Sequence, residues 1–138
     1  MKKIILGGAM ALFSFSFMQA QSVNDLPQPA KDVIQKHYKA WKVDKVNIDK
    51  DDRQEAFQVK FANGAKMDFN IEGYLTEIKG DTEIPAALIP EKVSYFVQNK
   101  YPEQKITEWE YEDGKHEIGL DNGTELEFDG NGKFLKVD

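Results

Sequence analysis

Apolar and polar residues alternate along this chain with two different periods, and the same change of period occurs twice. In residues 30–41 the apolar positions recur at intervals of three and four, which predicts an amphipathic helix. In residues 43–79 they occupy every second position, which predicts β-strands. A second helical stripe covers residues 89–101, and alternation then returns up to residue 137. The pattern therefore predicts two successive units, each a helix followed by strands.

Two Asn-Gly dipeptides mark turns of the predicted sheet. They lie at residues 63–64 and 122–123, which are 59 residues apart, and the same distance separates Phe69 from Phe128. Asn-Gly favours a two-residue hairpin turn, because both central positions of that turn need a positive φ. The strands of each unit are therefore expected to form an antiparallel meander.

One face of each predicted meander is apolar, so the helix that precedes it should cover that face. The expected fold class is α+β, a tandem repeat of a helix plus a four-stranded antiparallel meander, with the helices packed on one face of the sheet. The two units comprise residues 21–80 and 81–138 and together make one domain of 118 residues. Such a domain can bury a sufficient core without disulfides, and the sequence has no cysteine.

Residues 1–20 have the layout of a secretory signal peptide. Lys2 and Lys3 precede an apolar run over residues 4–17, and the small residue Ala20 stands where cleavage is expected. The apolar run is short for a membrane-spanning helix, and no cysteine follows it to carry a lipid anchor. An uncleaved N-terminal anchor is the alternative. We expect a periplasmic or secreted protein that has no stable membrane insertion after cleavage.

The net charge of the chain limits the kinds of molecule that it can bind. The chain has 18 basic and 24 acidic residues, and loss of Lys2 and Lys3 with the signal peptide leaves a net charge of about −8. A protein of this charge is repelled by nucleic acids and by anionic membrane surfaces. The composition therefore argues against nucleic acid and favours a cationic partner.

Few residues could carry catalysis. There is no cysteine, and neither serine beyond the signal peptide, Ser22 or Ser94, stands on a glycine-bounded nucleophile elbow. His37 belongs to the helical apolar stripe and His116 occupies the position of Phe57 in the other unit, so both are expected at the edge of the core. No histidines have metal-ligand spacing, and no glycine loop suits a phosphate. We predict that the protein is no enzyme and has no cofactor and no metal centre.

The second unit combines Tyr-Pro at residues 101–102, Trp109 and the segment Asn-Gly-Thr-Glu-Leu-Glu-Phe-Asp-Gly-Asn-Gly at residues 122–132. In this it resembles the PepSY-like family of secreted bacterial proteins, and the resemblance covers nearly the whole chain after the signal peptide. It implies a fold similar to that of the beta-lactamase inhibitor protein, with tandem units whose sheets form one curved surface. The first unit departs from the pattern, since Tyr38 has no following proline and Ile48 stands where tryptophan is expected. No catalytic residue comes with the resemblance, and beta-lactamase inhibition does not follow from fold alone.

Acidic residues alternate with the core positions of the second unit. They are Glu108, Glu110, Glu117, Asp121, Glu125, Glu127 and Asp129. The equivalent positions of the first unit carry mixed charges. Because like charges on adjacent strands cost stability, we predict that these side chains converge on the open sheet face and bind a basic surface; a merely solvated face is the alternative. Residues 129–132 are similar to part of a calcium loop but lack its final acidic ligand, so we predict a turn there.

These observations predict an exported, non-enzymatic protein-binding module, an inhibitor or regulator whose partner is another envelope protein with a basic surface. The alternative is a periplasmic protein that binds a small ligand or a cation in the groove between the two units. A hydrolase whose site the sequence does not reveal is a third possibility.

Overall fold

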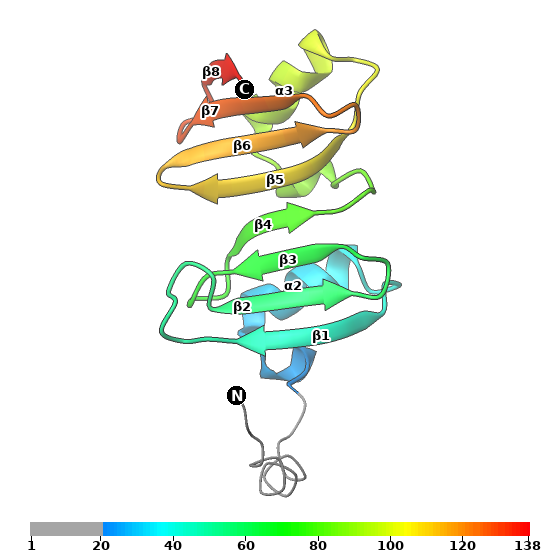
Figure 1. Ribbon diagram of the computed structural model, residues 1–138, viewed down its shortest axis with the longest axis vertical. Coiled ribbons are helices and arrows are strands. Elements are labelled where there is room, and N and C mark those ends of the chain that lie inside the picture. The colour runs from blue at the N-terminus through cyan, green and yellow to red at the C-terminus, as the bar shows by residue number, and fades with distance from the viewer. Residues whose placement is uncertain (1–20) are drawn as a thin grey trace, which may run out of the picture.

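The computed structural model describes residues 21–138, so the predicted signal peptide lies outside the described residues (Figure 1). Eight strands form one open antiparallel sheet in which each strand pairs with the next along the chain. They are β1 (Val43–Ile48), β2 (Phe57–Phe61), β3 (Lys66–Phe69), β4 (Leu75–Lys79), β5 (Ile106–Glu112), β6 (Lys115–Leu120), β7 (Glu125–Asp129) and β8 (Phe134–Val137). The α-helices are α2 (Gln28–His37) and α3 (Glu91–Lys100), and the 3₁₀ turns are η1 (Val23–Asp25) and η2 (Ala86–Leu88). The predicted α+β class is confirmed.

Each α-helix begins directly after a proline and is followed directly by a tyrosine at its C-cap. Pro27 precedes α2 and Pro90 precedes α3, which suits the helix start because proline has no N–H to leave unbonded there. The backbone N–H of Tyr38 donates to Ile34, and Tyr38 leaves the helical conformation with φ −135°. The predicted helix over residues 30–41 is therefore too long at its C-terminal end.

Trp41 reaches the core from the connection that follows α2. Its ring lies 4.5 Å from that of Tyr38 and 5.2 Å from that of Phe61 on β2. The interval of three residues from Tyr38 to Trp41 is the spacing of a helical stripe, and here it is produced by a turn, since the Trp41 N–H donates to the Tyr38 carbonyl. Apolar spacing alone does not distinguish the two arrangements.

The core lies between the sheet and the two helices, which Figure 1 shows behind the sheet, α2 behind the strands of the first half and α3 behind those of the second. Phe69 on β3 and Phe128 on β7 are completely buried. The ring of Phe96 on α3 lies 5.4 Å from that of Phe128. Most strand positions that point toward the helices are apolar, with His116 an exception, and the other face of the sheet carries the polar positions.

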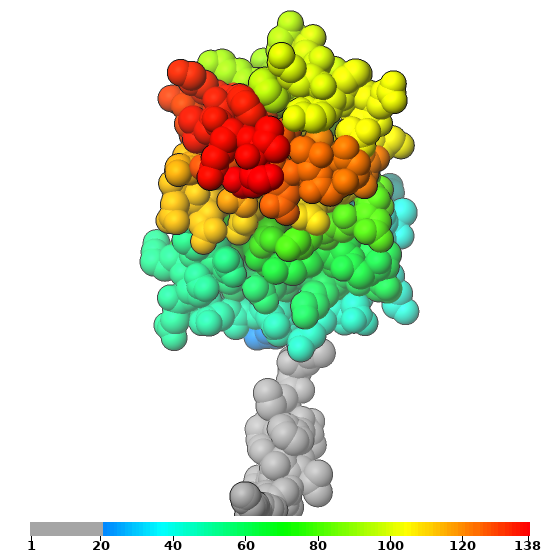
Figure 2. Space-filling model, turned by 45° about the horizontal axis from the view of Figure 1, so that its top comes forward, coloured from blue at the N-terminus to red at the C-terminus, as the bar shows by residue number. Residues whose placement is uncertain are grey.

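Strands β4 and β5 join the two halves of the chain into one sheet. Ile78 pairs with Trp109 across this seam, and Glu77 pairs with Glu110. Figure 2 shows the first half, cyan to green, and the second half, yellow to red, as one continuous surface. The two halves are thus joined by a hydrogen-bonded strand pair, and the polar face of the sheet runs across both of them.

Two structural constraints favour glycine at position 73, in the turn before β4. Gly73 has φ +94°, and a Cβ atom there would lie 2.7 Å from the Cβ of Pro27. Gly64 has φ +92° but nothing within 4 Å of the same position. We expect Gly64→Ala to lower the free energy of unfolding by about 1–2 kcal/mol through backbone strain. Gly73→Ala should lose about 1–3 kcal/mol more, because the Pro27 contact must also move.

Urea unfolding of both variants measures this difference, and Gly64→Ala serves as the control for backbone strain. Equal losses in the two variants would show that the contact between the β3–β4 turn and the start of α2 contributes nothing.

Candidate functional site

An unbroken row of acidic side chains crosses the open face of the sheet. In the register of β3 to β7, each member of the row is paired with the next. The row consists of Asp68, Glu77, Glu110, Glu117 and Glu127. Because carboxylates directly opposite each other destabilise a sheet, this row stores repulsion that a bound cation or a basic side chain would relieve.

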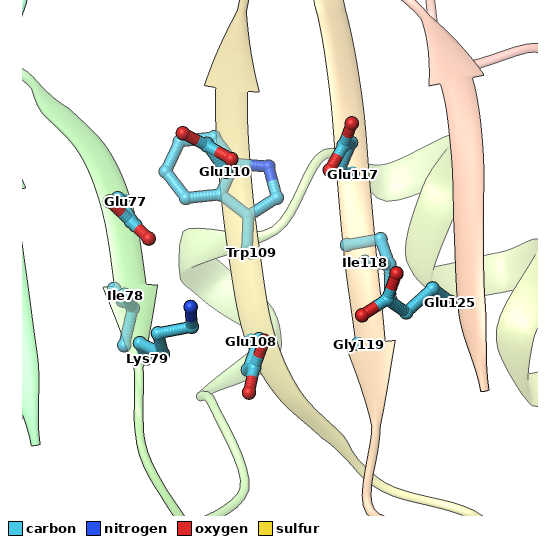
Figure 3. Close-up of a pocket in the computed structure, with 10 residues that line it drawn as sticks. All are labelled: Glu77, Ile78, Lys79, Glu108, Trp109, Glu110, Glu117, Ile118, Gly119 and Glu125. Carbon is cyan, nitrogen blue, oxygen red and sulfur yellow. The ribbon is translucent and has the colours of Figure 1, made fainter. Parts of the chain in front are cut away.

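A shallow notch of about 100 Å³ lies on the row at the seam between the two halves (Figure 3). Its charged lining consists of Glu77, Lys79, Glu108, Glu110, Glu117 and Glu125. Gly119 forms part of the lining, and a Cβ atom there would lie 3.0 Å from the Cβ of Glu108. In Figure 3, Glu125 extends from β7 over β6, and the Lys79 amine lies between Glu77 and Glu108. Five carboxylates thus face one ammonium group.

Two carboxyl groups of the notch, those of Glu110 and Glu117, have raised pKa values. Burial raises the pKa of Glu110, and the charges of Glu77 and Glu112 raise it further. Burial likewise raises the pKa of Glu117, with added repulsion from Asp138 and Glu127. Groups held in this way are partly desolvated anions that lack enough positive neighbours, which is the electrostatic state of a cation-binding surface.

At the far end of the row, lysines offset part of the negative charge. Glu127 is only 8% exposed, and its carboxylate lies 3.2 Å from the Lys115 amine and 3.8 Å from that of Lys136. Carboxylate oxygens of Glu117, Glu127 and Asp138 lie within 4.8 Å of one another. Two lysines already occupy the surroundings of this cluster, so its charge is largely neutralised by the protein itself.

Two of the seven predicted site residues belong to turns rather than to the notch. The Asp121 carboxylate accepts a hydrogen bond from the Lys105 N–H at 3.2 Å. The Asp129 carboxylate accepts hydrogen bonds from the N–H groups of Asn131 and Lys133, both at 2.9 Å, and these bonds lower the pKa of Asp129. Alternation along a strand placed both residues on the acidic face, but a position at a strand end lets the carboxylate turn back to bond the loop. The predicted turn at residues 129–132 is confirmed.

The remaining predicted residues lie on the open face. Glu108, Glu110, Glu117 and Glu125 line the notch, and Glu127 lies in the row with its lysine partners. Sequence reasoning missed the two members that the first half supplies, Asp68 and Glu77. Alternation along β3 and β4 indicates that both point to the open face, but only the β4–β5 pairing places them beside the acidic residues of the second half.

Asp68 is the most unusual member of the row. It is completely buried, and neither carboxylate oxygen accepts a hydrogen bond from the described residues. The nearest cation is the Lys66 ammonium, 3.7 Å from Asp68 Oδ2 and 3.7 Å from Glu77 Oε1. The pKa of Asp68 is raised to about 7, mainly by burial and also by contact with Glu77, while the charge of Lys66 opposes the shift.

His116, on β6, is buried in the core of the second half. His116 is 7% exposed and accepts a hydrogen bond at Nδ1 from the Trp109 indole N–H at 3.2 Å. Burial lowers the pKa of His116. A hydrogen-bond acceptor at Nδ1 requires that this nitrogen carry no proton, so the fold selects the neutral ring. The prediction that His116 is an edge-of-core residue agrees with this position.

Because the folded-state pKa of His116 lies below the unfolded value, its contribution to stability is present above the unfolded pKa and is lost as the pH falls. We expect the wild type to lose about 1 kcal/mol of unfolding free energy between pH 7.5 and pH 5, relative to His116→Phe, through loss of the Trp109 bond. Phenylalanine occupies the corresponding position in β2, at Phe57. Urea unfolding at the two pH values checks this, and identical pH dependence in both proteins would refute it.

Comparison with known proteins finds one family and several solved structures. The family model described as "Putative beta-lactamase-inhibitor-like, PepSY-like" matches residues 55–136. No curated protein matches the chain. A crystal structure from Bacteroides thetaiotaomicron, titled a "putative calcium-regulated periplasmic protein", is 30% identical with a TM-score of 0.79 and covers 87% of this chain and 95% of its own.

Two structures from Bacteroides vulgatus are also similar, and both are described as putative periplasmic proteins, one of them of unknown function. The first is 34% identical with a TM-score of 0.77 and covers 86% of this chain and 95% of its own. The second is 30% identical with a TM-score of 0.80 and covers 87% and 95%. The predicted periplasmic location is confirmed by this likeness. Within residues 21–138 no helix has the length and apolar character needed to cross a membrane.

Proposed function

Because the chain belongs to the PepSY-like family of beta-lactamase-inhibitor-like proteins, we propose that it is a non-enzymatic binding module of the cell envelope. In this proposal, two tandem helix-plus-meander units place both helices on one side of a curved sheet and leave the other side free. The free side docks a basic surface of another envelope protein and inhibits or regulates it. The observation that carries the proposal is the unbroken acidic row through the notch at the seam.

The size and charge of the notch favour a protein side chain over a small organic ligand. A volume of about 100 Å³ is below the roughly 300–1,000 Å³ of typical small-molecule pockets. It suits the head group of one arginine or lysine, and arginine can bond two carboxylate oxygens at once. Desolvated arginines are frequent anchors at the centres of interfaces. The notch would then hold an arginine or lysine side chain of the partner, and the rest of the row would orient the partner on the sheet.

A pull-down from an envelope extract tests this proposal. We expect the double variant Glu110→Lys/Glu117→Lys to retain less than a tenth of the partner that the wild type retains, because two attractive charges become repulsive. The matched control is Glu72→Lys/Glu103→Lys, which changes the net charge equally at exposed positions outside the row. Capture by the wild type should also weaken as salt is raised. If the row variant captures the partner as well as the control does, the docking proposal is wrong.

A second candidate function is binding of a divalent cation. It is supported by the calcium-regulated description of the relative from Bacteroides thetaiotaomicron and by the excess of carboxylates over lysines along the row. A cation that binds only the folded state must raise the melting temperature. Thermal unfolding in CaCl₂, compared with NaCl of equal ionic strength, tests this candidate, and equal melting temperatures would exclude it.

A further inference from the structure

A buried carboxylate without hydrogen bonds lies at the β3 end of the acidic row. Asp68 has no exposed area, and neither of its oxygens accepts a hydrogen bond from the described residues. Buried polar groups in native structures nearly always have such partners. Glu77 can serve as a hydrogen-bond partner only when one of the two carboxyl groups holds a proton. When both groups are ionised, the Asp68 carboxylate oxygens therefore accept no hydrogen bond from the described part of the chain and lie beside the Glu77 carboxylate.

Oxygen groups from three segments surround this pair. Glu77 faces Asp68 from β4. The Thr76 hydroxyl shares its one proton between the carbonyl oxygens of Gln54 at 3.3 Å and of Asp68 at 3.2 Å, and so holds the β1–β2 connection beside the site. Glu55 lies in that connection, is partly buried, and adds its negative charge to the field at Asp68. Three carboxylates from β3, β4 and a connecting loop thus share one neighbourhood.

The Lys66 ammonium supplies positive charge beside the Asp68 and Glu77 carboxylates. Its ammonium lies 3.7 Å from Asp68 Oδ2 and 3.7 Å from Glu77 Oε1. Both distances exceed the roughly 2.7–2.9 Å of a charge-assisted hydrogen bond. The Lys66 side chain is 34% exposed, so it has open solvent on one side and can leave the pair. The lysine therefore compensates both carboxylates without bonding closely to either.

We propose that Asp68 and Glu77 bind a divalent cation, Ca²⁺ in preference to Mg²⁺, which replaces the Lys66 ammonium between them. Glu55 from the β1–β2 connection supplies further negative charge to the bound ion. The ligand set contains only oxygen, which suits hard cations, and Ca²⁺ accepts the irregular arrangement that a loop and two strands provide, whereas Mg²⁺ demands near-octahedral geometry. This inference rests on the second candidate function and assigns its site; it is independent of the docking proposal.

Calorimetric titration of the EDTA-treated protein with CaCl₂ tests the site. We expect one bound Ca²⁺, and at least tenfold weaker binding in both Asp68→Asn and Glu77→Gln. Lys66→Met should bind Ca²⁺ about tenfold more tightly, because it removes the charge that competes with the ion. A purely structural role of Lys66 would not tighten binding. MgCl₂ should bind at least tenfold more weakly than CaCl₂.

Two control variants separate this site from the rest of the acidic face. Glu125→Gln tests the notch and Glu117→Gln tests the cluster with Glu127 and Asp138, and each should weaken Ca²⁺ binding less than threefold, because neither carboxylate is in the proposed ligand set. Circular dichroism and melting temperatures confirm that every variant is folded. The site is wrong if Asp68→Asn binds Ca²⁺ as the wild type does, or if the controls lose binding instead.

No heat of binding at 10 mM CaCl₂ in either the wild type or Lys66→Met would overturn both the site and the cation-binding function. Mg²⁺ affinity equal to that for Ca²⁺ would overturn the stated preference. Carried out in EDTA, the pull-down with Glu110→Lys/Glu117→Lys reports on docking without a bound cation.

Discussion

Replacing Asp68 by asparagine is expected to raise the free energy of unfolding at pH 8 by about 2–4 kcal/mol in the presence of EDTA. The cause is the buried carboxylate, whose pKa of about 7 in the folded protein exceeds the value near 3.9 of an unfolded chain. The folded state therefore binds the proton more tightly than the unfolded state does. The stability from the protonated form is fully present below pH 4 and is lost as the pH rises to about 7. Asparagine keeps the shape of the side chain and carries no charge.

Urea unfolding of the wild type and Asp68→Asn at pH 4 and pH 8 measures this effect. The two proteins should be close in stability at pH 4 and differ most at pH 8. Glu125→Gln is the control on the same face, and its gain should stay below about 1 kcal/mol because Glu125 is exposed. A wild type as stable as Asp68→Asn at pH 8 would show that Lys66 already compensates the ionised carboxylate.

Truncation of either central phenylalanine is expected to destabilise the whole chain. Phe128 is completely buried, with the rings of Phe96 and Phe134 5.4 Å and 5.7 Å away, and Phe69 is buried equally in the first half. Phe128→Ala and Phe69→Ala should each cost about 3–5 kcal/mol of unfolding free energy. Because β4 and β5 are hydrogen-bonded, we predict that the two halves unfold together.

The two tryptophans allow each half to be followed separately. Trp41 packs against β2 in the first half, and Trp109 lies on β5 in the second. Measured by fluorescence, Phe128→Ala should lower the urea midpoint by the same amount in a Trp41→Phe background and in a Trp109→Phe background, each compared with its own parent protein. If Phe128→Ala shifts only the transition that Trp109 reports, the chain contains two independently unfolding units.

Much of the fold could be predicted because its signals are local. The switch between periods of about 3.6 and 2 reports which residues face a core within one helix or strand. The Asn-Gly turns at residues 63–64 and 122–123 are present, and Gly64 and Gly123 have the positive φ that glycine readily adopts. The prediction that both central residues have positive φ is wrong there, because Asn63 and Asn122 do not. The end of α2 was missed because a turn placed Trp41 at a helical spacing.

The acidic face could be predicted only in part. Alternation showed which side of each strand Glu108, Glu110, Glu117 and Glu125 occupy, and the structure places all four at the notch. Alternation does not report which strand lies next to which, or in what register. It also does not show which carboxylates have lysine neighbours, as Glu127 does.

By itself the sequence determined the α+β class, the strand-rich order of elements and the polarity of each strand face, because these follow from short-range spacing. Only the tertiary structure decided that Glu77 faces Glu110 across the seam. It also decided that Asp68, on β3, is buried beside β4 and the β1–β2 connection. The physical reason is that charge repulsion and desolvation depend on distances between residues far apart in the chain, and strand pairing sets those distances.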